Sequence, residues 1–309
     1  MTFYSDYIVY TGYVKANCIL KQLKFLILCA IIIFPNEIYA QTVRHKFETH
    51  VYKTTGFSRL KLTVYQPSHI ALDKKLPAII FFHGGGLRER HTWEFEPQSE
   101  YLVERSMVAV IATYRVKRHG RTIFESIADA KSAIRWIRER ADELGIDENR
   151  IAAGGGSAGG YLAACAALVK NYDEKNEDLS ISSIPNALVL FNPRLVLPVM
   201  GDPPLTLKEI RYLNGRTVEE ISPVHNVYNG APPTIIFQGT ADKTVSIQEP
   251  ERFCEEMNNY GNTCEVVLYE GREHGFFNYF SGNNPDFLST METSVKFLSK
   301  LGYISQDNQ

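Results

Sequence analysis

A run of small residues around one serine constrains the fold of this chain more than any other feature. Residues 153–160 read Ala-Gly-Gly-Gly-Ser-Ala-Gly-Gly, after a short apolar run at 151–152 and before an alanine-rich stretch at 161–169. Residues 155–159 fit G-x-S-x-G, a sharp turn from strand to helix that lifts a serine hydroxyl above a sheet. Glycines suit such a turn because its backbone is strained and the strand and helix approach closely. The pattern therefore predicts strand, turn and helix, with Ser157 at the tip.

Strand-like and helix-like segments alternate along most of the chain, which predicts an α/β fold with a mostly parallel central sheet and helices on both faces. An opening hairpin is expected at 46–52 and 60–65, where leucine and valine alternate with polar residues. Further strands are expected at 78–82, 108–113, 149–153, 187–191, 234–237 and 265–269. Helices are expected at 96–105, 122–144, 161–169, 246–261 and 287–301.

Two Ser/Thr-x-x-Glu patterns refine the helix starts. Thr122 with Glu125, and Ser246 with Glu249, have the spacing of a capping box, in which each side chain bonds the other residue's backbone N–H. Both pairs are predicted to open helices.

Residues 194–233 interrupt the alternation, being rich in proline and glycine with one helix-like piece at 207–213. We interpret them as a cap-like insertion over the site, within one catalytic domain of residues 41–309.

The N-terminal segment has the composition of a secretory signal peptide. Lysines at 15, 21 and 24 precede an apolar run at 25–34, and Ala40 offers a small residue for cleavage before Gln41. Ten apolar residues are fewer than the roughly 20 that a transmembrane helix needs, although a membrane anchor stays an alternative. We expect residues 1–40 to be removed, leaving an exported, periplasmic or secreted protein without stable membrane insertion. The true translation start stays open.

Three cysteines remain after this segment. Cys165 falls on the alanine-rich helix and is expected to be a small buried residue. Cys254 and Cys264 flank a helix end and the next strand, where an exported protein can form a disulfide. Two unpaired buried thiols are the alternative, because a sequence cannot establish disulfide geometry.

Composition excludes several classes of partner. The 309 residues carry a formal net charge of −2, which gives no electrostatic reason to expect nucleic acid or an anionic membrane surface. The histidines lack the spacing of metal ligands, so neither a metal nor a cofactor is expected. The oligomeric state stays open.

Three polar residues follow predicted strands in an order that suits nucleophilic catalysis. Ser157 is the candidate nucleophile, and it needs an adjacent base because a free hydroxyl is a weak nucleophile. His274 follows the last strand and is the candidate base, while Asp242 follows the preceding strand and would orient the imidazole. The order Ser, Asp, His is that of α/β-hydrolases.

A glycine triplet supplies the fourth element. His83-Gly84-Gly85-Gly86 follows the buried strand at 78–82. The N–H groups of Gly84 and Gly85 are expected to join that of Ala158 in an oxyanion hole around a tetrahedral intermediate.

These motifs resemble the hormone-sensitive-lipase-like branch of α/β-hydrolase esterases and the related bacterial feruloyl and acetyl-xylan esterases. The resemblance spans residues 76–301 and implies an α/β-hydrolase fold, with Ser157, Asp242 and His274 as the triad and Gly84, Gly85 and Ala158 as the oxyanion hole. Asp129, Arg135 and Trp136 match a helix pattern of that family and are expected to be structural, ion-paired and packed beneath the serine turn.

The resemblance implies a serine carboxylesterase that removes short acyl groups, acetyl or hydroxycinnamoyl, from a carbohydrate. Lipase-like members carry a helical cap before the sheet, whereas strands are predicted directly after residue 41, so a more open site and a bulky or polysaccharide alcohol are expected. A general esterase or lipase for small esters is the alternative. A non-catalytic binding module is disfavoured because every candidate triad residue is present.

Overall fold

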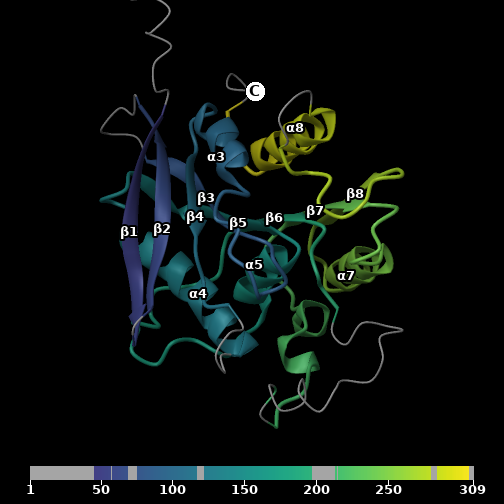
Figure 1. Cartoon of the computed structure of the whole chain (residues 1–309), viewed down its shortest axis with the longest axis horizontal. Coiled ribbons are helices and arrows are strands. Elements are labelled where there is room, and N and C mark those ends of the chain that lie inside the picture. The colour runs from purple at the N-terminus through teal and green to yellow at the C-terminus, as the bar shows by residue number, and fades with distance from the viewer. Residues whose placement is uncertain are drawn as a thin grey trace, which may run out of the picture. The chain divides into compact units, whose positions relative to one another are not determined.

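The computed structural model describes residues 45–56, 58–68, 75–116, 122–196, 213, 215–279 and 284–305. The expected signal peptide and almost all of the helix-like piece at 207–213 lie outside these residues. Within them, helices cover both faces of one sheet (Figure 1), as the sequence predicts. No helix in the described ranges is both long enough and apolar enough to cross a membrane.

Eight strands form the sheet in the order β1-β2-β4-β3-β5-β6-β7-β8. The strands β1 and β2 make the predicted opening hairpin, and β2 also pairs antiparallel with β4. From β4 to β8 every neighbouring pair is parallel. The bounds are β1 His45–Thr55, β2 Ser58–Pro67, β3 Leu76–Phe82, β4 Val108–Ala112, β5 Ile146–Gly156, β6 Ala187–Phe191, β7 Thr234–Gly239 and β8 Cys264–Tyr269.

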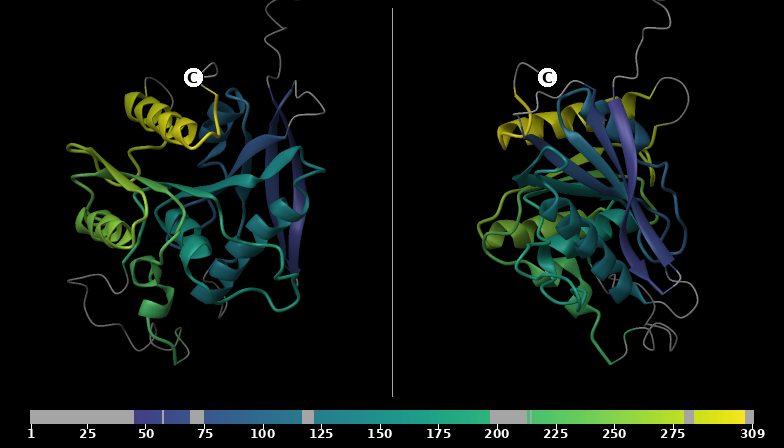
Figure 2. Two further views of the ribbon diagram at one scale, coloured as in Figure 1. Left: turned by 180° about the vertical axis from the view of Figure 1, so that it is seen from behind. Right: turned by 90° about the vertical axis from the view of Figure 1, so that its left-hand side faces the viewer.

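The central strands are apolar throughout because both of their faces are covered. In β3 the side chains alternate between two cores, with Ile80 in one and Phe81 in the other. The helices α4 (Ile123–Glu139), α5 (Ala158–Leu168) and α7 (Gln248–Asn259) cover the first face, and α3 (Glu96–Val103) and α8 (Pro285–Lys300) cover the second (Figure 2). This is the layering that alternating strands and helices predict.

The two expected capping boxes have different outcomes. The Thr122–Glu125 box at the start of α4 is present. At α7 the expectation is wrong, because the helix begins at Gln248 without a side-chain cap. The Glu249 carboxylate instead accepts hydrogen bonds from the backbone N–H groups of Leu195 (3.1 Å) and Val196 (3.3 Å). A distant segment therefore uses the carboxylate that the local pattern assigned to the helix start.

The described end of the 194–233 segment packs against the main domain. It contains two short 3₁₀ helices, Glu219–Ile221 and Pro223–Asn226. The Tyr161 hydroxyl on α5 donates a hydrogen bond of 2.9 Å to the Ile221 carbonyl, and Ile221 and Val224 are buried in the core under α5.

Cys254 and Cys264 form a disulfide that joins α7 to the start of β8, with their Cα atoms 5.2 Å apart. Of the two arrangements that the sequence allows, the structure has the bonded one. Cys165 is a buried free thiol on α5, as expected.

Candidate active site

The predicted catalytic residues lie at the carboxyl ends of neighbouring strands. Ser157 directly follows β5, Asp242 is the third residue after β7, and His274 lies in the segment after β8. In the sheet β5 lies between β3 and β6, and β7 lies between β6 and β8. Because parallel strands end at one edge, the glycine triplet after β3 and these three residues share that edge.

The serine turn is held in a conformation that only small neighbours allow. Ser157 has φ of 52°, which is unusual for a residue with a side chain. Its N–H donates a hydrogen bond of 2.8 Å to the carbonyl of Phe191 at the end of β6. A Cβ on Gly155 would lie 2.5 Å from the carbonyl oxygen of Phe82, and one on Gly159 only 1.9 Å from it. The glycines are therefore required by the close approach of β3.

Asp242 and His274 meet directly. The imidazole Nδ1 donates to Asp242 Oδ2 at 2.7 Å, since a carboxylate can only accept. The Asp242 side chain is completely buried, whereas that of His274 is 26% exposed. This bond holds Nδ1 protonated, so Nε2 can accept a proton. Among the described residues the imidazole bonds to Asp242 and not to the Ser157 hydroxyl; such contacts are often loose before substrate binds.

Four further donors hold the Asp242 carboxylate. The N–H groups of Thr244 (2.8 Å) and Val245 (2.9 Å) donate to Oδ1, while the side-chain amides of Asn192 (2.9 Å) and Gln238 (3.1 Å) donate to Oδ2. Burial raises the pKa of Asp242, but the hydrogen bonds from His274 and the two backbone groups outweigh it, so the net pKa lies below its ordinary value. The carboxylate is charged at neutral pH.

Asn192 is a site residue that the sequence analysis missed. It directly follows Phe191 on β6, and its own N–H donates to the carbonyl of Phe237 on β7 at 2.9 Å. Its side chain bonds Asp242 on one side, and its Oδ1 accepts from the N–H of Gly275 at 3.4 Å. The end of β6 thus connects the serine turn to the Asp242–His274 pair. A polar residue directly after a buried strand was the signal available in the sequence.

His83 is a structural member of the glycine loop. Its ring is buried, stacks on Tyr114 with centroids 4.3 Å apart, and donates from Nδ1 to the Gly84 carbonyl at 2.7 Å. The Tyr114 hydroxyl donates to the His83 carbonyl at 2.8 Å. Burial lowers the pKa of His83 to about 4, so the ring is neutral at physiological pH.

The three backbone N–H groups expected in the oxyanion hole, those of Gly84, Gly85 and Ala158, have different surroundings. The N–H of Gly84 donates to the Glu94 carboxylate at 2.5 Å, and Glu94 is a second residue that the sequence analysis missed. Gly85 has φ of 100°, a backbone conformation that favours glycine. Ala158 is the first residue of α5, where an N–H has no acceptor within the helix.

Asp129, Arg135 and Trp136 take structural positions on α4. The Asp129 carboxylate pairs with Arg115 (2.7 Å) and Lys53 (2.8 Å), while Arg135 pairs with Asp173 at 2.6 Å. The expected ion pairs are therefore present, each with a partner from another segment.

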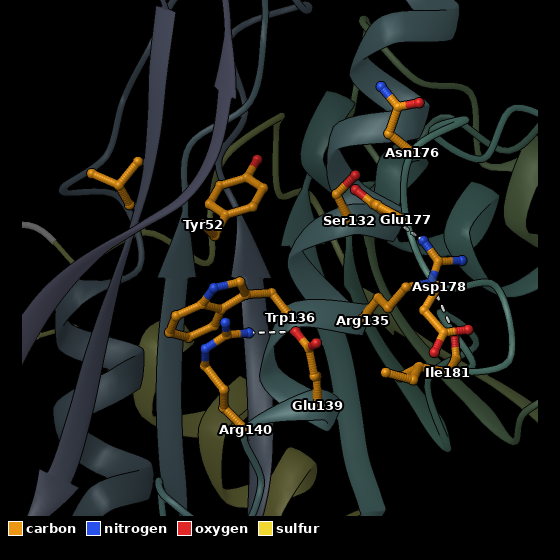
Figure 3. A pocket seen from close by; sticks show the side chains of 11 residues that line it. Tyr52, Ser132, Arg135, Trp136, Glu139, Arg140, Asn176, Glu177, Asp178 and Ile181 are labelled. Atoms are coloured by element: carbon orange, nitrogen blue, oxygen red, sulfur yellow. Dashed lines mark hydrogen bonds and ion pairs between the residues drawn. The ribbon is translucent and has the colours of Figure 1, made fainter.

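A hollow that none of the candidate catalytic residues lines lies between β1, the last turns of α4 and residues 176–181 (Figure 3), with a volume of about 370 Å³. Four of its charged side chains form two ion pairs, Arg135 with Glu177 and Arg140 with Glu139. The Arg140 guanidinium also lies 4.6 Å over the Trp136 ring. The helix α4 begins after the carboxyl end of β4 and ends before β5 begins, so this hollow is near the opposite edge of the sheet from Ser157.

Within the described ranges, no group of three or more His, Cys, Asp or Glu residues could hold a metal ion. The geometry at the sheet edge suits acyl transfer, because a strained serine, a histidine–carboxylate pair and backbone donors occur together.

The chain is similar to several known proteins. The family profile described as BD-FAE matches residues 62–191, and that of the Prolyl oligopeptidase family matches residues 204–300. A solved thermophilic esterase of Thermogutta terrifontis is 43% identical, with a TM-score of 0.79 over 85% of this chain and 95% of that chain. The same esterase is solved with propionate bound and with butyrate bound, each 43% identical with a TM-score of 0.78 over 84% of this chain and 95% of that chain.

Curated relatives are more distant. The isoprenylcysteine alpha-carbonyl methylesterase of Arabidopsis thaliana is 28% identical over 70% of this chain and 54% of its own length. The acetylxylan esterase of Xylanibacter ruminicola is 24% identical over 64% of this chain and 41% of its own length. The chain spans about half the length of several of the curated relatives that it matches.

Proposed function

Because this chain belongs to the α/β-hydrolase esterases, we propose that it is a serine carboxylesterase that releases short acyl groups through Ser157, His274 and Asp242. The observation that carries this proposal is the 2.7 Å bond from His274 Nδ1 to the buried Asp242 carboxylate, at the sheet edge that also holds the serine turn. That bond leaves Nε2 of His274 as the proton acceptor that a serine nucleophile needs.

The reaction then proceeds in two halves. In the first, Ser157 Oγ attacks the ester carbonyl carbon while His274 Nε2 takes the hydroxyl proton, and backbone N–H groups stabilise the oxyanion. The C–O bond to the alcohol breaks, the imidazolium returns the proton to the leaving alcohol, and an acyl-serine remains. In the second half, a water molecule gives a proton to His274 Nε2 and attacks the acyl carbon. The bond from this carbon to Ser157 Oγ breaks, the imidazolium returns the proton to Oγ, and the carboxylic acid is released.

We propose acetyl and similarly short acyl groups as substrates, carried on a carbohydrate. The relative from Thermogutta terrifontis is solved with propionate and with butyrate, and another relative is an acetylxylan esterase. Trp93 supports a bulky alcohol, because its side chain is 58% exposed in the segment that follows the glycine loop. A flat indole of this kind offers a face to the apolar side of a sugar ring.

Hydrolysis of p-nitrophenyl esters with two to eight acyl carbons, compared with acetate release from acetylated xylan, tests the substrate. Turnover that falls with chain length and clear acetate release are expected. Activity on alkyl esters alone would reject the carbohydrate part and leave the general small-ester esterase. The Ser157→Ala variant should lose both turnover and labelling by a fluorophosphonate. Labelling of that variant at the wild-type rate would remove Ser157 from the proposal.

A peptidase is a second candidate, favoured by the match of residues 204–300 to the Prolyl oligopeptidase family. That range contains Asp242 and His274. Release of p-nitroaniline from a prolyl anilide, measured beside the esters, would distinguish the two activities. We expect the ester to be the faster substrate.

We also propose that residues 1–40 direct export to the periplasm or medium. The Cys254–Cys264 disulfide supports this, because disulfides persist mainly in oxidising compartments. Mass spectrometry of the protein recovered from the periplasm and medium of an expressing bacterium should find Gln41 as the first residue. An intact N-terminus retained in the cytoplasm would contradict export.

A further inference from the structure

One carboxylate at the sheet edge has no part in the triad. Glu94 lies in the segment between the glycine loop and α3, and its Oε2 accepts the N–H of Gly84 at 2.5 Å. Both of its carboxylate oxygens lie 3.2–3.3 Å from where a Cβ on Gly84 would be. Burial raises the pKa of Glu94, although the Gly84 N–H, the neighbouring imidazoles of His91 and His274 and the side chain of Asn278 oppose this. Glu94 is half-buried, so its carboxylate gives up part of its contact with water and needs hydrogen-bond donors from the protein in return.

The same carboxylate reaches the segment that carries His274. The side chain of Asn278, four residues after His274, lies beside Glu94 and interacts with its carboxylate. The neighbouring carbonyl of Phe277 accepts a second tether, at 3.5 Å, from the Gln98 side chain on α3. Glu94 and Gln98 therefore both interact with the histidine segment, residues 274–278: Glu94 with the side chain of Asn278 and Gln98 with the backbone carbonyl of Phe277.

The serine turn lies between these two loops. A Cβ on Gly156, the residue before the nucleophile, would be 2.5 Å from Phe277 Cζ and 3.4 Å from Glu94 Oε1. Phe277 and Glu94 thus fill the space that a side chain at position 156 would occupy. Glu94 bonds the glycine loop and lies beside both the serine turn and the histidine segment.

We propose that Glu94 is a positioning residue that ties the glycine loop to the histidine segment and so sets the distance between oxyanion donors and base. Because the Glu94 carboxylate accepts the Gly84 N–H, the proposal differs from the sequence-based expectation in leaving out Gly84 as an oxyanion donor and keeping Gly85 and Ala158 as the candidates. This inference rests on the proposed esterase function, and it adds a residue that touches neither substrate nor reacting atoms.

Glu94→Ala tests the proposal, since it removes the acceptor from both loops. Losing a whole oxyanion donor costs about 10²–10³ in rate, and a loosened loop should cost somewhat less. We expect kcat on p-nitrophenyl acetate to fall about 10- to 100-fold with KM changed less than about threefold. The matched control is Glu96→Ala, an exposed acid two residues later, which should keep wild-type kcat.

Glu94→Gln should recover most of the loss, and this separates positioning from a need for charge. The glutamine carbonyl can still accept the Gly84 N–H. Its NH₂ can donate to Asn278 after that amide turns over, because Oδ1 of Asn278 is buried without a partner among the described residues. Asn278→Ala cuts only the link to the histidine segment, and we expect it to lower kcat by itself.

The outcomes are distinct. Wild-type kcat in both Glu94→Ala and Asn278→Ala would overturn the positioning role, while an inactive Ser157→Ala would keep the esterase proposal intact. A Glu94→Gln variant as slow as Glu94→Ala would also overturn it, because charge would then be what matters. Failure of the wild type to hydrolyse any ester would instead reject the proposed function. Should Glu94→Ala lack a cooperative thermal transition, Asn278→Ala and Glu94→Gln decide the question.

Discussion

Replacing Asp242 by asparagine is the most informative single change, because the structure gives both its kinetic and its thermodynamic effect. The Asp242 side chain is fully buried and accepts five hydrogen bonds: two backbone N–H groups on Oδ1, and His274, Asn192 and Gln238 on Oδ2. An asparagine must turn its NH₂ toward one of these two sets of donors. No orientation satisfies both sets.

Each orientation has a calculable consequence. If the NH₂ faces the backbone, two N–H groups lose their acceptor, at about 1–3 kcal/mol for each buried donor left unpaired. If it faces His274, the imidazole must accept through Nδ1, and Nε2 then carries the proton that it should receive from Ser157. That wrong tautomer costs about 10⁴ in kcat in serine hydrolases. We therefore expect Asp242→Asn to lose about 2–4 kcal/mol of stability and about 10⁴ in kcat.

The assay is p-nitrophenyl acetate hydrolysis with a thermal melt on the same samples. A loss of 2–4 kcal/mol should lower Tm by roughly 5–15 °C for a domain of this size. Asp142→Asn is the matched control, because its carboxylate is 87% exposed, and both quantities should stay unchanged. A kcat within tenfold of wild type in Asp242→Asn would refute the reasoning that this carboxylate orients the base.

Three further predictions concern the framework of the site. Because the pKa of Asp242 is lowered in the folded state, its contribution to stability is complete above about pH 4, the pKa of the unfolded side chain, and is lost as the pH falls further. Urea denaturation should show that the free energy of unfolding declines from pH 6 to pH 3, and that it declines less in Asp242→Asn. Gly159→Ala would place a Cβ 1.9 Å from the Phe82 carbonyl oxygen and should lower the free energy of unfolding by about 3 kcal/mol or more. Surface variants ordinarily shift Tm by up to about 2 °C, so a shift no larger than that would contradict this prediction. Replacing Cys254 and Cys264 by serine opens a loop with a sequence separation of 10 and should lower the free energy of unfolding by about 2–3 kcal/mol. A lower Tm with unchanged kcat at 25 °C is expected, whereas an unchanged Tm would show that the disulfide adds no stability.

The sheet and the position of the site could be predicted because both depend on local patterns. The apolar run of β3 and the alternation in β2 each follow from which faces are covered, and glycines around Ser157 mark the turn. Since parallel strands share an edge, a polar residue after each strand is enough to bring Asp242 and His274 together. No long-range information was needed for these features.

The residues that support the site could not be predicted in this way. Glu94 and Asn278 are neighbours in the structure although they lie far apart in the sequence. Asn192 can reach Asp242 only because β6 lies between β5 and β7 in the sheet. The same applies to Glu249, whose capping spacing is genuine but whose carboxylate serves a distant backbone. A side chain with several possible partners is assigned by the tertiary structure, which sequence spacing does not contain.

The end of β6 has a consequence for anyone who alters this enzyme. The Phe191 carbonyl accepts the N–H of Ser157, the proposed nucleophile, and the side chain of Asn192 next to it donates to Asp242, the carboxylate proposed to orient His274. A substitution beneath this strand end would therefore displace both halves of the proton-transfer machinery in concert, and activity would collapse although every catalytic side chain was intact. Libraries that seek new substrates should keep the β6 terminus and Glu94 fixed and diversify Trp93, whose side chain is exposed.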